Sequence, residues 1–314
     1  MNTKTIYKYF NLILKIIIGV FAFVFIVYKI KSGLAENLNY IKSTKVEYQY
    51  LVVSLFLMLL NWGVESYKWK YIIRKYVQIN FFKAFKFVLT GVTISLITPN
   101  RVGEIPARVM LLNGYEKSKD LVWLTTLGAF SQLLITVMLG VVGLFFSSHY
   151  FKNYYFNFLF LVLFGCVLLL SMLFVSFQKM PSFFQKIPIL NKLSSKDFKE
   201  LSFVELANVL ILSALRYAVF CLQYWLVLKA FSIHLDEIQE IMLIPVCFLI
   251  ASIIPTILLS EIGVRTSVAV FVFGMVSDNV IAIILASLLL WIINIALPAF
   301  LGLFNLNQLT ILKE

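Results

Sequence analysis

Six apolar stretches of membrane-spanning length constrain this chain more than any other feature. A helix of about 20 apolar residues crosses the hydrocarbon core of a bilayer, which is about 30 Å thick. Hydrophobic residues make up 61% of the chain and charged residues only 13%, too few to cover an ordinary soluble domain. We therefore predict an all-α polytopic membrane protein with full spans at 9–30, 50–72, 120–146, 154–177, 203–230 and 280–304.

The distribution of charge along the chain predicts its topology. The links 68–86 and 179–199 are rich in lysine and arginine, whereas the link 231–240 is acidic. Cytoplasmic loops of membrane proteins carry an excess of Lys and Arg, so we expect a cell (inner) membrane protein with both termini cytoplasmic. The segment 179–199 interleaves lysines with large apolar residues and is expected to lie on anionic lipid. These features account for the net charge of +12 without nucleic acid as a partner.

Two further apolar segments, 81–118 and 237–278, must begin and end on the same side of the membrane under this topology. A proline interrupts each of them, and proline ends a helix by removing a backbone donor. Non-helical backbone at membrane depth is tolerated only where protein or a water-filled cavity satisfies it. We therefore predict two re-entrant helical hairpins, with breaks at Pro99, Gly103, Pro255 and Gly263.

An internal repeat relates the two hairpins. The run from Glu104 to Arg108 (EIPAR) recurs as the run from Glu261 to Arg265 (EIGVR), half the chain length later. Other positions along the chain recur at nearly the same offset, which predicts two repeat units. Three membrane crossings separate the starts of the two units, so the second unit is inverted in the membrane relative to the first. We accordingly divide the single membrane domain into an N-terminal span and link (1–49), a first repeat unit (50–146), a connecting span with its basic link (147–205) and a second repeat unit (206–304).

The motif residues resemble a known family. Thr98-Pro99-x-Arg101-x-Gly103-Glu104-x-x-x-Arg108, with Pro255 followed by Glu261-x-Gly263-x-Arg265, is similar to flippase-like membrane proteins such as the membrane half of bacterial lysylphosphatidylglycerol synthases. The resemblance covers most of the chain. It implies movement of a phospholipid or lipid-linked headgroup between leaflets. Fused family members add a soluble aminoacyl-transferring domain after the last span, and we expect this chain to lack it.

Ionisable residues inside the apolar segments are the candidate site residues. A charge at the centre of a bilayer costs about 2.5–3.5 kcal/mol on insertion scales and usually marks a substrate or ion path. Arginine suits a phosphate because its planar guanidinium donates two parallel hydrogen bonds. The predicted substrate-binding residues are Arg101, Glu104, Arg108, Arg216, Glu261 and Arg265.

In this prediction the arginines contact the phosphate, and the carboxylates either orient them or bind a cationic headgroup. Glu and Arg four positions apart share one helix face, so the alternative is that each pair only holds its hairpin closed. Asn61 and Glu65 lie in the region that the repeat relates to Arg216, so a contact across the repeat is one alternative. For Glu65 we favour the other, an interfacial charge beside Lys68.

Signatures of catalysis are absent from the sequence. It contains no nucleotide-binding glycine motif, no zinc-protease motif and no cysteine pair of metal-binding spacing, so we expect no cofactor and no metal. Two alternatives to translocation stay open: a membrane-embedded transferase acting on a polyprenyl-phosphate or phospholipid, with Glu104 or Glu261 as the base, and a non-catalytic accessory subunit. The sequence also leaves open a homodimer or a partner enzyme.

Overall fold

A computed structural model describes most of the chain after residue 45. The described residues are 24, 27, 28, 31, 46–96, 98, 101–112, 118–151, 156–177, 179, 200–256 and 258–305. Most of the predicted first span, Pro99 and nearly all of the basic segment 179–199 lie outside them, so the predictions for these parts are not tested.

Within the described residues the fold is entirely helical, as predicted. In this part of the chain, five helices are long and apolar enough to cross a membrane: α3 (Tyr48–Ile73), α6 (Ser118–Phe146), α7 (Phe156–Phe177), α9 (Phe203–Ala230), and a last span in which α13 (Val280–Trp291) continues through the π-helical turn η4 (Ile292–Ala296) into α14 (Leu297–Leu303). The bounds fall close to those read from the apolar runs. The multi-pass helical architecture is therefore confirmed for this part of the chain.

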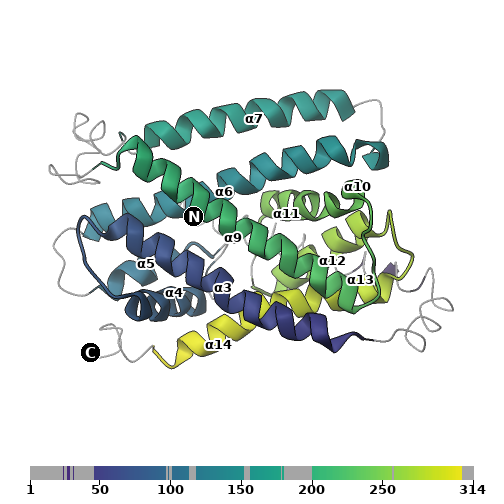
Figure 1. The fold of residues 1–314 in the computed structure, drawn as a ribbon, viewed down its shortest axis with the longest axis horizontal. Helices are drawn as coiled ribbons and strands as arrows, with labels where there is room; N and C mark the ends of the chain where they lie inside the picture. Colours follow the sequence, from purple (N-terminus) through teal and green to yellow (C-terminus); the bar gives the residue numbers. More distant parts are fainter. Residues whose placement is uncertain are drawn as a thin grey trace, which may run out of the picture.

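Shorter helices occupy the two segments predicted to be hairpins. The first contains α4 (Phe81–Ser95) and α5 (Glu104–Met110), and the second contains α10 (Ile238–Ile241), α11 (Leu243–Ile253) and α12 (Leu258–Phe273). A 3-10 turn, η2 (Ser148–Phe151), follows α6. In Figure 1, α4 and α5 lie in the left half of the molecule, whereas α11 and α12 lie in the right half.

The predicted helix breaks have different outcomes. Pro255 lies between α11 and α12, as expected for a residue that ends a helix. Gly263 lies inside α12, so its assignment as a break is wrong; a single glycine costs a helix only about 1 kcal/mol, and the surrounding turns outweigh it. Gly103 immediately precedes α5 and donates its N–H to the Thr98 Oγ1 at 3.0 Å. A Cβ at Gly103 would lie 2.5 Å from the Thr98 methyl carbon, so this approach requires glycine.

Packing joins the two halves of the chain. Helices α3 and α9 lie along each other, α4 packs against α14, and α11 packs against α6 (Figure 1). Glycines allow the last two contacts: a Cβ at Gly302 would collide with Thr93 and the Leu89 carbonyl, and one at Gly140 would collide with Leu249. We call α4 with α5, and α11 with α12, the two short-helix pairs. Each pair therefore packs on a long span from the other half.

Helix α7 is the outlier among the long helices. It packs mainly against α6, where the Trp123 and Phe177 rings stack with centroids 4.5 Å apart. Only 6% of the residues in its most apolar stretch are buried. The exposed remainder is typical of a lipid-facing surface.

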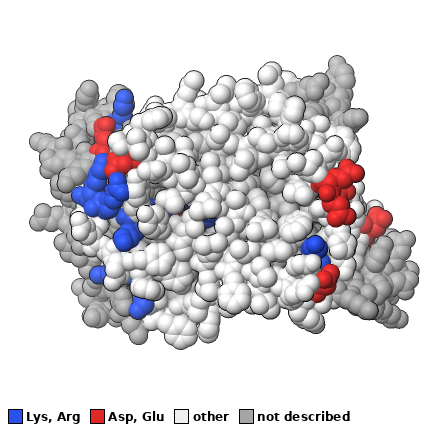
Figure 2. All heavy atoms as spheres, in the orientation of Figure 1, with Lys and Arg blue, Asp and Glu red and all other residues white. Residues whose placement is uncertain are grey.

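On the face shown in Figure 2, most charged residues gather at the two ends of the long axis, and the broad belt between them is almost entirely uncharged. One end carries Arg74 and Lys75, which both contact Glu205, at 2.7 and 2.6 Å. The hydrogen bond to Glu205 raises the pKa of the Arg74 guanidinium. The opposite end carries acidic residues around α10, among them Glu237 and Glu240. The belt exposes large apolar side chains, as a surface against hydrocarbon does.

Candidate functional site

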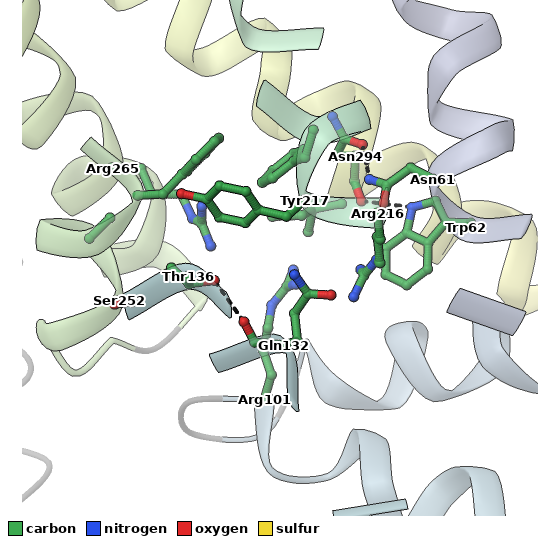
Figure 3. A pocket seen from close by; sticks show the side chains of 14 residues that line it. Asn61, Trp62, Arg101, Gln132, Thr136, Arg216, Tyr217, Ser252, Arg265 and Asn294 are labelled. Carbon is green, nitrogen blue, oxygen red and sulfur yellow. Dashed lines mark hydrogen bonds between the residues drawn. The ribbon is translucent and has the colours of Figure 1, made fainter. Parts of the chain in front are cut away.

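A polar cavity of about 200 Å³ lies where the two halves of the chain meet. Side chains from six of the described helical elements and from the segment before α5 converge on it (Figure 3). The lining residues are Asn61, Trp62, Arg101, Gln132, Thr136, Arg216, Tyr217, Phe220, Phe248, Ala251, Ser252, Arg265, Asn294 and Ile295.

Glu65 of α3 is the centre of a buried ion cluster beside this cavity. It is 5% exposed and accepts hydrogen bonds from Arg108 Nη1 at 2.9 Å and from Arg216 Nη1 at 3.0 Å. Lys68 Nζ lies 2.9 Å from the same carboxylate. This one carboxylate therefore ties together α3, α5 and α9, and its contact with Arg216 is the cross-repeat alternative left open by the sequence.

The interpretation of Glu65 as an interfacial charge is wrong, and so is the placement of Lys68 in a cytoplasmic link. Lys68 is 1% exposed and donates to the Gly128 carbonyl at 3.1 Å and to Ser213 Oγ at 3.2 Å. The reason is that α3 continues to Ile73, so the turn containing Glu65 and Lys68 packs against α6 and α9. Buried charges persist when they are paired in this way.

Arg108 and Glu104 lie behind the cavity wall rather than on it. Arg108 is 4% exposed and pairs with Glu104 one turn earlier on α5. Gly91 of α4 makes room for it, since a Cβ there would lie 2.8 Å from the Arg108 Cγ. Neither residue lines the cavity. Of the predicted binding residues, Arg101, Arg216 and Arg265 do line it.

Glu261 of α12 connects the two predicted hairpins. It accepts from Arg265 Nε at 2.9 Å, and its other carboxylate oxygen lies 3.3 Å from Arg101 Nε in the segment before α5. Arg101 has a φ of 59°, an uncommon and strained conformation for a residue with a side chain. Its Nη2 atom is buried and makes no hydrogen bond within the described residues. Most buried polar atoms in proteins have a hydrogen-bond partner, so this atom is unusual.

Arg216 of α9 is also held by Asn61 and Trp62 of α3, and the contact with Asn61 is a second cross-repeat contact that the sequence left open. Its Nε donates to Asn61 Oδ1 at 3.0 Å, and its guanidinium lies 5.0 Å from the Trp62 ring centroid. Asn61 in turn donates to Asn294 Oδ1 at 3.1 Å, and Trp62 Nε1 donates to the Asn294 carbonyl at 3.2 Å. Asn294 lies in the π-helical turn, a distortion often found at functional sites. A lone Asn in the run 280–304 was the signal that could have identified it.

Basic groups outnumber acidic groups in this cluster. It contains Lys68, Arg101, Arg108, Arg216 and Arg265, against Glu65, Glu104 and Glu261. Electrostatic interactions are strong in a medium of low dielectric constant, so the excess positive charge favours an anion in the cavity. The arrangement is suited to holding a phosphate or carboxylate.

Comparison with known families agrees with this architecture. The family model described as lysylphosphatidylglycerol synthase TM region matches residues 12–302. The chain belongs to this family. The match includes both short-helix pairs and every residue predicted to bind substrate, so the resemblance inferred from the two motifs is confirmed. No curated protein gives a significant sequence match to this chain.

Proposed function

We propose that this protein translocates a phospholipid or a lipid-linked headgroup between the leaflets of the membrane. One observation carries the proposal: a polar cavity lined by Arg101, Arg216 and Arg265 lies within an apolar helical bundle, where the two halves of the chain meet. Well-packed apolar residues could replace buried ion pairs with little loss of stability, so a scaffold alone does not need them. A path for an anionic group does.

We further infer that the two short-helix pairs are re-entrant hairpins of an inverted repeat. Their placement in opposite halves of the molecule supports this, as do the exchanged contacts of α4 with α14 and of α11 with α6 (Figure 1). The ion pair between Arg101 and Glu261 joins the segments that follow α4 and precede α12. Transporters with inverted repeats bind substrate near the midplane, between the repeats, which is where this cavity would lie. The repeat units in this proposal are 50–146 and 206–304.

The charge distribution supports an orientation in the cell membrane. The end that carries Arg74 and Lys75 is assigned to the cytoplasm, and the acidic end around α10 to the outside (Figure 2). Both termini are then cytoplasmic. A contact of the segment 179–199 with anionic lipid is part of the same proposal.

In the proposed mechanism the headgroup enters the cavity while the acyl chains stay in lipid. The substrate phosphate takes the place of Glu261 as a partner of Arg101 and Arg265, which separates the two hairpins and opens the path to the other leaflet. Glu65 holds Arg216 in position through its 3.0 Å contact. The pair of Glu104 and Arg108 keeps the first hairpin closed and does not touch the substrate.

Reconstitution in liposomes tests this proposal. The purified protein is placed in vesicles with an acyl-labelled phospholipid, and transfer is followed by quenching the label in the outer leaflet. Loss of a bidentate phosphate contact in Arg101→Gln or Arg265→Gln should slow transfer by about tenfold or more. Arg74→Gln is the matched control, because Arg74 lies at the end of the molecule and pairs with Glu205 instead. Unchanged transfer by both folded cavity variants would remove the arginines from the path.

A further inference from the structure

The last membrane span changes partners at its π-helical turn η4. Before the turn, α13 packs against α12 of the second short-helix pair, and after it α14 packs against α4 of the first (Figure 1). The buried apolar core divides at the same place. Ile283, Ala286 and Leu290 belong to the cluster that contains residues of α12, whereas Ile293 and Ala299 belong to the cluster that contains residues of α4. One span therefore holds both short-helix pairs, one on each side of the turn.

The helical hydrogen bonding of this span is interrupted at the turn. The Leu297 N–H donates to the Ile292 carbonyl, which is the longer bond of a π-helix and not that of an α-helix. In an α-helix the Asn294 carbonyl would accept from the N–H of residue 298, but this residue is Pro298, which has none. Sharp bends in helices concentrate at prolines and π-turns. The last span therefore bends most easily beside Asn294.

Side chains of α3 occupy the place of the missing backbone donor. Trp62 Nε1 donates to the Asn294 carbonyl at 3.2 Å, and Asn61 Nδ2 donates to Asn294 Oδ1 at 3.1 Å (Figure 3). The same two residues hold Arg216 at the polar cavity. The turn is thus anchored to α3 beside the cavity by side-chain bonds, while proline leaves its own backbone bonding incomplete.

Helix α6 is the counterpart of the last span in the proposed repeat and lacks this interruption. It also contacts both short-helix pairs, through α5 and α11. At the spacing that relates Glu104 to Glu261, Asn294 corresponds to Val137, which lies inside one continuous α-helix without a proline. Helix α6 and the last span therefore both join the pairs, and of these two only the last span has a built-in place to bend.

We propose that η4 is the hinge of the translocation cycle. When the substrate phosphate displaces Glu261 and the short-helix pairs separate, α13 tilts with the second pair while α14 stays with the first, so the last span bends beside Asn294. Helix α6 keeps its shape. Hinges in proteins are formed by a few residues that absorb the change in backbone angles. This inference rests on the proposed translocation, to which it adds the place where the chain bends.

Hydrogen–deuterium exchange of backbone amides, measured by mass spectrometry on the protein in lipid nanodiscs, tests the hinge. Residues 292–297 are compared with the corresponding turn 135–140 of α6, because Asn294 and Thr136 line the same cavity and meet the same water. Exchange at 292–297 should be about two- to tenfold faster, the effect of about one net hydrogen bond. Equal exchange of the two turns would count against the hinge.

The response to a substitution on another helix separates a hinge from a static distortion. Glu261→Gln removes the carboxylate that joins Arg101 to Arg265, so the short-helix pairs should separate more often. Exchange at 292–297 should then rise by about two- to tenfold more, and exchange at 135–140 should not change. No rise at 292–297, or the same rise in both turns, would overturn the hinge.

Pro298→Ala supplies the missing N–H to the Asn294 carbonyl and should stiffen the span. Exchange at 292–297 and transfer of acyl-labelled phosphatidylglycerol or phosphatidylethanolamine should both fall by about two- to tenfold, while the midpoint of thermal unfolding stays the same or rises. A role in stability alone would not slow transfer by a protein that unfolds no earlier. Unchanged exchange and transfer in this variant would overturn the hinge.

Pro245→Ala is the matched control for this substitution. Pro245 lies in the first turn of α11, where the N–H groups of a helix have no partner within the helix, so exchange at 292–297 and transfer should not change. Equal slowing by both proline variants would assign the effect to a general loss of proline and overturn the hinge.

Trp62→Phe acts on the same carbonyl in the opposite direction. It keeps an aromatic ring near Arg216 and removes the donor to Asn294, so exchange at 292–297 should rise by about two- to tenfold. A fall or no change would overturn the anchoring of the turn to α3.

Exchange and transfer distinguish a failed hinge from a failed translocation. The expected exchange responses, without lipid transfer by the unmodified protein, would keep the bend in this span and overturn translocation. Transfer by the unmodified protein, with exchange at 292–297 that neither Glu261→Gln nor Pro298→Ala alters, would keep translocation and overturn the hinge.

Discussion

Replacing Glu65 by glutamine should destabilise the protein strongly, because this carboxylate neutralises three buried cations. Lys68, Arg108 and Arg216 all lie 2.9–3.0 Å from its oxygens, and Lys68 and Arg108 are almost completely buried. Removing one partner of a buried ion pair costs about 3–5 kcal/mol, since the remaining charges stay desolvated. At about 2–4 °C per kcal/mol, the midpoint of thermal unfolding should fall by roughly 6–20 °C.

The assay is thermal unfolding of the protein in detergent, followed by the fluorescence of its tryptophans. Glu205→Gln is the matched control: Glu205 also contacts two cations, but Arg74 and Lys75 lie at the charged end, with side chains 44% and 29% exposed. Pairs with such exposed partners contribute about 0–1 kcal/mol. Restoration of part of the lost stability by Glu65→Gln combined with Lys68→Met would identify charge imbalance as the cause. A midpoint for Glu65→Gln within about 2 °C of the wild type would refute this reasoning.

Two further predictions concern packing and the polar network. Gly302→Ala should cost about 1–3 kcal/mol, because the added methyl group overlaps Thr93 on α4, whereas Gly165→Ala on α7 meets no atom within 4 Å and should be neutral or slightly stabilising in the same unfolding measurement. Asn294→Leu should cost about 1–3 kcal/mol, because Asn61 loses its buried hydrogen-bond partner, and a stability equal to that of the wild type would contradict the importance of this bond.

The long helices could be predicted from the sequence because their cause is local. Each full span within the described residues is a mostly apolar run with few charged residues, and a single run of that length can satisfy its own backbone in lipid only as a helix. The end of α11 before Pro255 follows in the same manner from the chemistry of one residue. Gly263 failed as a predicted break because glycine, unlike proline, keeps its N–H and is tolerated inside α12.

The partners of the buried charges could not be predicted, because they depend on contacts between distant elements. Spacing alone paired Glu104 with Arg108 and Glu261 with Arg265, and both pairs are present. It did not indicate that Arg101 would reach Glu261 or that Glu65 would bind Arg108, and the repeat offered the contact of Glu65 with Arg216 only as the less favoured alternative. Those contacts require that α3 lies along α9 and that the two short-helix pairs approach each other, which no local pattern specifies.

By itself, the sequence determined that this chain is a helical membrane protein with two related, proline-interrupted segments that carry Glu and Arg one helical turn apart. These properties follow from the length of apolar runs and from the helical period, both of which act within a few turns of the chain. Only the tertiary structure decided which of the charged groups line the cavity and which lie behind it. That division depends on close packing between distant helices, permitted by glycines such as Gly91 and Gly302, and on the pairing that buried charges require.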